Sequence, residues 1–124
     1  MLVKDAMRRP FVVDKDISLA EAARIMSSKD IGSLLFLSGN KVKGIVTEGG
    51  LLRNFGKHEK ISQIMETNVI TIKADENLDK AVDIMKENKI KRLPVVDDGK
   101  LVGIITITDL IANIENLEEN FFFE

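Results

Sequence analysis

Apolar residues recur with a helical period in two stretches of this chain. They are separated by three or four positions between residues 19 and 26 and again between residues 78 and 85, which is the spacing of an amphipathic helix. Ser18, with Glu21 three residues later, is a capping box for the first helix, and Asn77 is a good N-cap for the second. The pattern predicts two helices with these apolar faces: Leu19, Ala22, Ala23 and Met26, and Leu78, Ala81, Val82 and Met85.

Short β-prone runs surround each predicted helix. They cover residues 11–13, 33–37 and 42–47 in the first half, and 69–72, 92–96 and 101–106 in the second. Gly39-Asn40 and Asp98-Gly99 are pairs that tolerate positive φ, as a two-residue hairpin requires. A further helix follows at 48–54 and at 108–114. Pro94 has no N–H, so we expect it at a strand start or an exposed edge.

The two halves of the chain are copies of one another. Many residues recur 59 positions later, and the first of them are Leu19, Ala22, Ile25 and Met26, matched by Leu78, Ala81, Ile84 and Met85. Near the start of each copy the offset is 58, which pairs Val3 with Ile61 and Met7 with Met65. We assign a first repeat to 1–56, a polar linker to 57–60, a second repeat to 61–116 and a C-terminal tail to 117–124.

This order of elements predicts an α+β fold. Each β-α-β-β-α unit has a small sheet with one helical face, so one unit alone leaves apolar surface exposed. We therefore expect two units packed sheet to sheet with pseudo-twofold symmetry. A second copy of the chain is expected to cover further apolar surface, which predicts a homodimer.

Composition excludes several kinds of site. The chain has no cysteine, which excludes disulfides and thiolate metal sites, and His58 is its single histidine. The net charge of −2 gives no basic field for nucleic acid, and no apolar run approaches the roughly 20 residues that span a membrane. The charged start, Met1–Asp5, is not that of a signal peptide. We expect a cytoplasmic protein with no metal site and no catalytic residues.

One stretch of the second repeat carries a family resemblance. The run Gly-Ile-Ile-Thr-Ile-Thr-Asp at 103–109, preceded by Ile-Lys-Arg-Leu-Pro-Val-Val-Asp at 90–97, resembles a repeat of the cystathionine-beta-synthase (CBS) family. Duplication, element order and spacing agree over nearly the whole chain. The resemblance implies a stand-alone regulatory module in which a pair of repeats holds AMP, ADP, ATP or S-adenosylmethionine in the cleft between them.

Asp109 and two threonines are the centre of the predicted site. Thr106 is expected to end a strand and Asp109 to lie in the first turn of the next helix, where a carboxylate is stabilised by the positive helix end. A carboxylate there can accept two hydrogen bonds from a ribose diol, while Thr106 and Thr108 can donate to phosphate or ribose oxygens. The alternative is that Asp109 caps the helix and the threonines bond to the local backbone.

The resemblance implies further contacts for the ligand. Lys91 and Arg92 are implied to face the cleft and meet phosphate, a role that suits arginine, and Ile104 is implied to line the site. The alternative for the two cations is a solvated pair at a strand start. An adenine slot is implied from the first repeat, built by Phe11, Val12 and Val13 with Ile31, Gly32 and Ser33.

The first repeat departs from this pattern. Gly50 stands where the second repeat has Asp109, Gly49 replaces the threonine, and Glu48 adds negative charge that disfavours phosphate. We therefore expect a second, weak or empty site, whose members are Thr47, Gly50, Val69, Ile70 and Ile90.

Two other functions compete with nucleotide sensing. One is a dimeric scaffold or interaction protein with a vestigial cleft, which the altered first repeat makes credible. The other is an enzyme, which the lack of convergent carboxylates and metal ligands argues against. In the tail, Phe121–Phe123 are expected to dock on the same chain, on a dimer mate or on a regulated partner protein.

Overall fold

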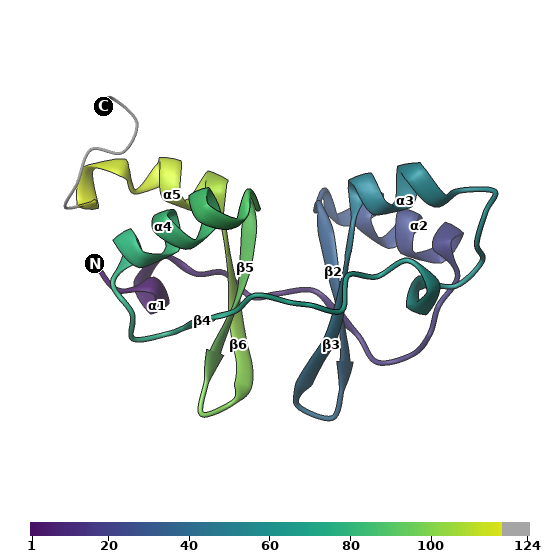
Figure 1. The fold of residues 1–124 in the computed structure, drawn as a ribbon, viewed down its shortest axis with the longest axis horizontal. Helices are drawn as coiled ribbons and strands as arrows, with labels where there is room; N and C mark the ends of the chain where they lie inside the picture. Colours follow the sequence, from purple (N-terminus) through teal and green to yellow (C-terminus); the bar gives the residue numbers. More distant parts are fainter. Residues whose placement is uncertain (118–124) are drawn as a thin grey trace. The chain divides into compact units, whose positions relative to one another are not determined.

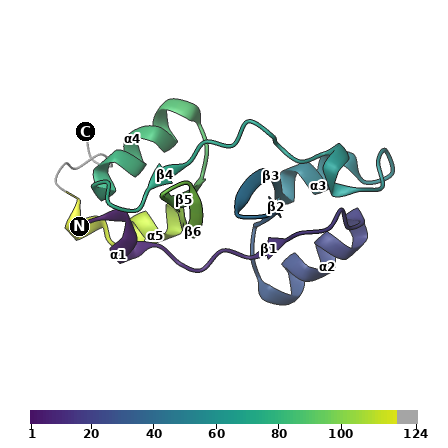
Figure 2. The same cartoon turned by 90° about the horizontal axis from the view of Figure 1, so that it is seen from below.

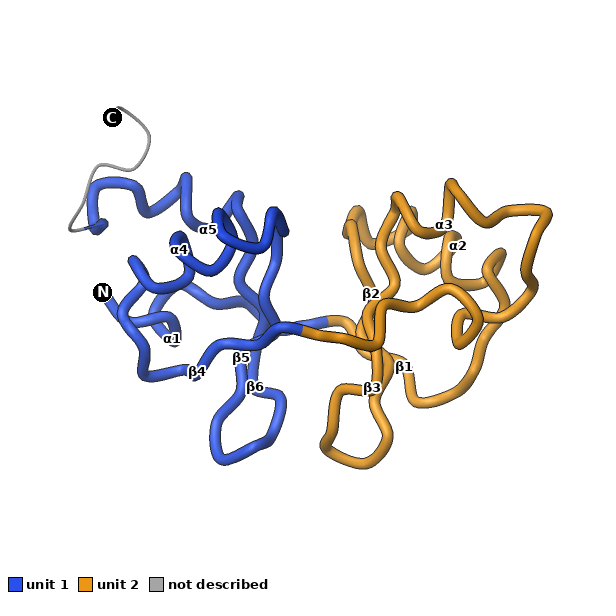
Figure 3. The backbone as a smooth tube through the Cα atoms, in the orientation of Figure 1, with its two compact units in different colours: residues 1–10, 70–124 blue, residues 11–69 orange. Residues whose placement is uncertain are grey.

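The computed structural model describes residues 1–117, so the predicted docking of Phe121–Phe123 lies outside the described residues. The chain forms two compact units (Figure 3). Unit 1 contains Met1–Pro10 and the chain from Ile70 onward, and unit 2 contains Phe11–Val69. The units therefore do not coincide with the sequence repeats, because the first ten residues join the second half of the chain.

The elements follow the predicted order (Figure 1). The first half contains α1 (Val3–Ala6), β1 (Val12–Val13), α2 (Leu19–Lys29), β2 (Ser33–Ser38), β3 (Lys41–Thr47) and α3 (Glu48–Asn54). The second half contains the 3-10 turn η1 (Ile61–Gln63), β4 (Ile72–Lys73), α4 (Leu78–Asn88), β5 (Arg92–Asp97), β6 (Lys100–Thr106), α5 (Ile107–Ala112) and η2 (Ile114–Asn116). The α+β class and the repeated β-α-β-β-α order are confirmed. Helix α1 was not predicted, because four residues are too few to show a helical period.

Each unit has one three-stranded sheet, in the order β1-β2-β3 or β4-β5-β6. The first pair is parallel and the second antiparallel, and Ser33 pairs with Thr47 as Arg92 pairs with Thr106. The predicted hairpin turns are present. Asp98 and Gly99 both take positive φ, whereas in the other turn Gly39 alone does. Positive φ at both central residues, or at the first of them alone, is the backbone conformation of the two-residue turns that favour hairpins.

Pro94 was predicted at a strand start or an exposed edge, and this was wrong. It is the third residue of β5, the central strand, and its side chain is fully buried. In unit 2 the equivalent residue, Leu35, donates its N–H to the carbonyl of Phe11 at 3.0 Å. Pro94 has no such donor, and the parallel ladder of β4 first pairs at Val95. The central strand thus tolerates proline because its neighbour starts one position later.

The predicted helix faces form the two cores. Helix α2 buries Leu19, Ala22 and Met26, and helix α4 buries Leu78, Ala81, Val82 and Met85. Ser18 Oγ accepts a hydrogen bond from the Glu21 N–H at 3.1 Å, and Asn77 Oδ1 accepts one from the Asp79 N–H at 2.9 Å. Both N-cap residues are therefore the ones that the sequence predicted, although of the capping box predicted at Ser18 only the bond to the Ser18 side chain is present among the described residues.

The N-terminal segment of each repeat packs in the unit formed by the other repeat. The Val3 N–H donates to the Glu76 carbonyl at 2.8 Å, and the Val3 side chain is buried in the core of unit 1. Figure 2 shows α1 near the N-terminus of the chain, among the other helices of unit 1. In unit 2, the Ile61 N–H donates to the Ile17 carbonyl at 3.0 Å, and Ile61 is likewise buried. Neither repeat completes its core with its own N-terminal residues.

A carboxylate holds the second of these segments in place. Asp16 Oδ2 accepts a hydrogen bond from the Ser62 hydroxyl at 2.6 Å, and Asp16 Oδ1 accepts one from the Ser62 N–H at 2.9 Å. Both hydrogen bonds favour the charged form of Asp16 and so lower its pKa below the ordinary value. The bond from the Ser62 hydroxyl has the larger effect, and the bond from the Ser62 N–H comes next. The two hydrogen bonds stabilise the folded protein at pH values above the pKa that Asp16 has in the unfolded chain. This stabilisation is lost as the pH falls through the lower pKa that Asp16 has in the folded protein.

We predict that Ser62→Ala raises the pKa of Asp16 toward its ordinary value, because the largest cause of its lowering is removed. NMR titration of the Asp16 side-chain carbonyl carbon measures this directly. Ser62→Thr keeps a hydroxyl donor and is the control. An unchanged Asp16 pKa in Ser62→Ala would contradict the assignment of this hydrogen bond.

Candidate ligand-binding site

The predicted site residues of the second repeat lie at one edge of unit 1, where β6 ends and α5 begins. The Ile107 N–H, at the start of α5, donates to the Lys91 carbonyl at 2.9 Å, and Arg92 is the ladder partner of Thr106. Lys91 and Thr108 are exposed, and Arg92, Ile104 and Thr106 are half-buried. The structure thus brings the predicted phosphate-binding and ribose-binding residues of this repeat to the same edge.

Asp109 is the one buried charged residue at this edge, with 7% of its surface exposed. Its Oδ2 accepts hydrogen bonds from the Thr106 N–H at 2.8 Å and from the Thr106 hydroxyl at 3.0 Å. Asp109 therefore caps α5, as one of the two interpretations of the sequence proposed. Its contact with a ligand stays a prediction.

Arg8 is a member of this edge that the sequence did not reveal. Its Nε lies 2.9 Å from Asp109 Oδ1, and one Nη donates to the Thr106 hydroxyl oxygen at 3.3 Å. The Arg8 side chain is 61% exposed, while that of Asp109 is nearly enclosed. A buried carboxylate requires such a partner, because an unpaired charge in the interior is strongly unfavourable. The sequence carries no local signal for this pair, since Arg8 lies in the other repeat.

The backbone fixes the position of Arg8. Its N–H donates to the Ile104 carbonyl and its carbonyl accepts from the Ile104 N–H, both at 2.9 Å. Met7 packs over Gly103, where a Cβ atom would come within 2.5 Å of the Met7 sulfur. The absence of a side chain at Gly103 therefore allows residues 7 and 8 to lie flat against β6.

The partners of Asp109 limit what else it can bind. An ionised carboxylate has about four acceptor positions, and three are used by the Thr106 N–H, the Thr106 hydroxyl and Arg8 Nε. One acceptor position remains. The predicted capture of both ribose hydroxyls therefore requires one existing donor to move.

The equivalent edge of unit 2 has different chemistry on the same backbone. Glu66 forms the two-bond bridge with Ile45 that Arg8 forms with Ile104. Thr47 Oγ1 accepts from the Gly50 N–H at 3.1 Å, so a threonine caps α3 in the absence of an aspartate. The Glu48 N–H donates to the Gly32 carbonyl at 3.1 Å, as Ile107 does to Lys91.

The two edges therefore carry opposite charge. The edge of unit 1 holds three positively charged residues, Arg8, Lys91 and Arg92, and one negative residue, Asp109, which is paired with Arg8. In unit 2 the equivalent positions hold two negative residues, Glu48 and Glu66, and no cation, because Gly32 and Ser33 replace the lysine and arginine. An anionic ligand is favoured at the first edge and disfavoured at the second.

The remaining predicted residues are divided between the units. Phe11 and Val12 are exposed, and Gly32 and Ser33 lie at the start of β2, all in unit 2. Lys29 Nζ lies 5.1 Å from the centre of the Phe11 ring, a cation–π distance. For the predicted second site, Val69 belongs to unit 2, whereas Ile70 and Ile90 pack against the core of unit 1. That these residues join Asp109 or Gly50 around a ligand stays a prediction.

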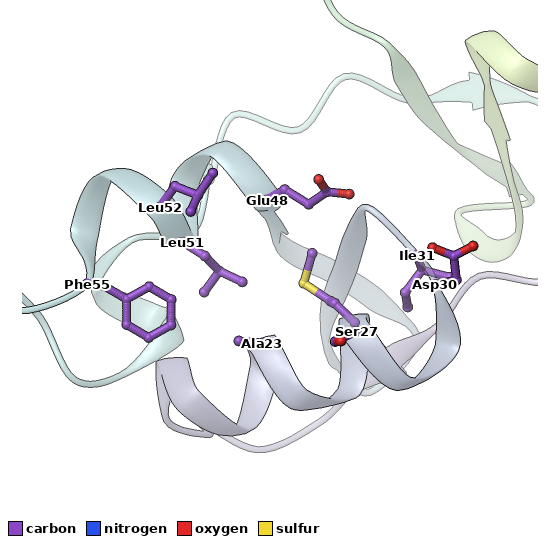
Figure 4. A pocket seen from close by; sticks show the side chains of 9 residues that line it. Ala23, Ser27, Asp30, Ile31, Glu48, Leu51, Leu52 and Phe55 are labelled. Carbon is purple, nitrogen blue, oxygen red and sulfur yellow. The ribbon is translucent and has the colours of Figure 1, made fainter.

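Unit 2 also contains a pocket that the sequence did not predict. It lies between α2 and α3 and has a volume of 340 Å³ (Figure 4). Its lining is mostly apolar, with carboxylates from Asp30 and Glu48, and Figure 4 shows the side chains of Leu52 on α3 and of Phe55 just after this helix. Of the residues that the family resemblance assigns to the adenine slot, Ile31 alone lines this pocket.

Within residues 1–117, no helix is long and apolar enough to cross a membrane. The same part of the chain has no group of three or more histidine, aspartate or glutamate residues arranged to hold a metal ion.

Comparison with known proteins identifies two matches to the CBS domain model, at residues 3–57 and 61–116. The crystal structure of the CBS domain pair of protein MJ0100, in complex with 5′-methylthioadenosine and S-adenosyl-L-methionine, has a TM-score of 0.86 and 33% identity. It covers 93% of this chain and 96% of that chain. A structure of an uncharacterised conserved protein from Pyrococcus horikoshii has a TM-score of 0.84 and 28% identity, covering 95% of both chains.

Among curated proteins, the inosine-5′-monophosphate dehydrogenase of Nitrosopumilus maritimus is 35% identical over 111 residues. The match covers 88% of this chain and 23% of the dehydrogenase. The CBS domain-containing protein YhcV of Bacillus subtilis is 29% identical, with 90% of this chain and 84% of that protein covered. The chain thus spans about a quarter of the dehydrogenase that it matches.

We predict that Asp109→Asn lowers the free energy of unfolding by about 1 kcal/mol, because the ion pair with Arg8 is lost while an amide oxygen still accepts from Thr106. Asp109→Ala removes the cap as well, and we expect a loss of about 2 kcal/mol. Denaturant-induced unfolding measures both. Equal losses in the two variants would contradict a stabilising role for the cap.

Proposed function

The chain belongs to the CBS-domain family, and from this premise we propose that it is a regulatory module that binds an adenosine-bearing ligand at the Asp109 edge of unit 1. The observation that carries the proposal is the buried carboxylate of Asp109, bonded to Thr106 and Arg8, at an edge that also carries Lys91 and Arg92. The 33% identical MJ0100 pair, which was crystallised with two adenosine compounds, supports this ligand class.

Each residue at this edge has a proposed role. Asp109 accepts from the ribose, Thr108 donates to ribose or phosphate oxygens, and Lys91 and Arg92 bind phosphate. The hydroxyl of Thr106 donates its one proton to Asp109, so its role is to hold this carboxylate in place. AMP, ADP, ATP and S-adenosylmethionine are the proposed ligands. The adenine is proposed to contact residues of the first repeat, as the family resemblance implies: Phe11, Val12, Gly32 and Ser33.

Binding at this edge is proposed to regulate rather than to catalyse. A ligand shifts an equilibrium only as far as it binds one conformation better than another. Arg8 and Asp109 come from the two ends of the chain, so a ligand at Asp109 can act on the docking of the N-terminal segment. This segment is the proposed element through which a partner protein senses the ligand.

We predict saturable binding of at least one of AMP, ADP, ATP and S-adenosylmethionine, with a large loss in Asp109→Ala because the ribose acceptor is removed. Isothermal titration calorimetry on protein purified without nucleotide measures this. Asp97→Ala removes the same charge from an exposed position on β5 and is the control. If none of the four ligands binds the wild-type protein, the proposed function is wrong.

We also propose that the chain forms a homodimer through its helices. Leu52 on α3 is 79% exposed and Ile111 on α5 is 57% exposed, and both flank other exposed apolar residues. Apolar helix faces of this kind are buried in stable oligomers. The pocket between α2 and α3 provides a recess for apolar side chains of the second copy.

Leu52→Glu together with Ile111→Glu is predicted to convert the dimer into monomers, since two charges from each chain would be buried in its interface. Sedimentation velocity gives the mass of the species in solution. Val102→Glu, at an exposed position on β6, should leave the mass unchanged. A monomeric wild-type protein would contradict this proposal.

A second candidate function is a non-catalytic dimeric scaffold with a vestigial site. The observation that favours it is the edge of unit 2, where Gly50 and Glu66 replace the residues of the Asp109 edge. A scaffold would bind its partner equally with and without nucleotide, whereas a sensor would not.

A further inference from the structure

The guanidinium group of Arg8 has donors that its partners do not use. Arginine carries five N–H donors, of which one on Nε bonds to Asp109 and one on Nη bonds to Thr106. Among the residues that the structure describes, none accepts from the other three. Because the side chain is 61% exposed, these donors face solvent at the ligand edge of unit 1.

A ribose diol competes with Arg8 for Asp109. One acceptor position of the carboxylate is open, whereas two hydroxyl groups require two. The bonds from Thr106 are part of the local cap of α5, so the donor most easily displaced is Nε of the exposed Arg8. Displacement leaves a guanidinium that has lost its carboxylate, and an anionic group on the ligand can replace it.

We infer that Arg8 is a specificity-determining residue, which selects adenosine ligands that carry an anionic 5′ group over ligands that are neutral there. This inference rests on the proposed function and assigns the charge preference of that same site. A neutral adenosine ligand breaks the Arg8–Asp109 ion pair without replacing it. A 5′-phosphate replaces it with a charge-assisted hydrogen bond.

The equivalent positions of unit 2 support a shared role of Arg8 and Asp109 in binding the ligand. Where unit 1 has Arg8 and Asp109, unit 2 has Glu66 and Gly50 on the same backbone bridge and helix turn. Both residues of the pair differ between the two units, although the units have the same fold with either set of residues. Such a joint difference fits two residues that serve one ligand.

The test compares AMP with adenosine in four proteins by isothermal titration calorimetry. In the wild type we expect AMP to bind more tightly than adenosine. In Arg8→Gln we expect this preference to fall by about tenfold, mainly through weaker AMP binding, as the loss of one charge-assisted hydrogen bond predicts. Arg9→Gln removes the same charge from the next residue, which is exposed, and should keep the wild-type preference.

Arg8→Lys keeps the charge but not the planar fork, so its preference for AMP should lie between those of the wild type and Arg8→Gln. If Arg8 had a purely structural role, its substitution would weaken the binding of AMP and of adenosine by the same factor. Equal weakening, or an unchanged ratio in Arg8→Gln, would overturn the inference and leave the proposed function intact. If wild-type protein binds neither AMP nor adenosine, nor the other three proposed ligands, the proposed function itself fails.

Discussion

Two short antiparallel bridges determine how this chain is organised. Arg8 and Ile104 exchange two backbone hydrogen bonds in unit 1, and Glu66 and Ile45 exchange two in unit 2. Each bridge joins the N-terminal segment of one repeat to the third strand of the other. Gly103 and Gly44, which precede Ile104 and Ile45, make these bridges possible. A Cβ atom at either glycine would collide with the methionine that packs over it, Met7 or Met65.

The exchange makes each repeat dependent on the other. Val3 and Ile61 are fully buried, yet each lies in a core built mostly by the opposite repeat. A single repeat would lack this apolar contact and would leave strand edges unpaired. The structural unit is therefore the pair of repeats, and the same exchange delivers Arg8 to Asp109.

The two units keep one fold while differing in chemistry, because helix capping is satisfied in two ways. In unit 1, Asp109 accepts from the Thr106 N–H, and in unit 2, Thr47 accepts from the Gly50 N–H. The Asn54 side chain donates to the Gly50 carbonyl, and the Asn113 side chain donates to the Asp109 carbonyl, so the two helices are stabilised in the same way. The loss of an aspartate at position 50 thus removes a charge without removing the helix start.

Local patterns in the sequence determined the elements and their duplication. The helix faces, the caps at Ser18 and Asn77 and the two hairpin turns depend on residues close together in the chain, so they could be predicted from it. The same is true of the edge formed by Lys91, Arg92, Thr106 and Asp109, which follows from one hairpin and one strand-to-helix junction. Their role in binding a ligand stays a prediction.

Tertiary structure alone decided what crosses between the repeats. No local pattern shows that Val3 packs with α4, or that Arg8 pairs with Asp109 at the far end of the chain. The position of Pro94 in a central strand likewise depends on where the neighbouring strand begins. The physical reason is the same in each case: the local sequence sets backbone conformation and the apolar face, whereas contacts between distant segments depend on which docking buries the most apolar surface and leaves no charge unpaired.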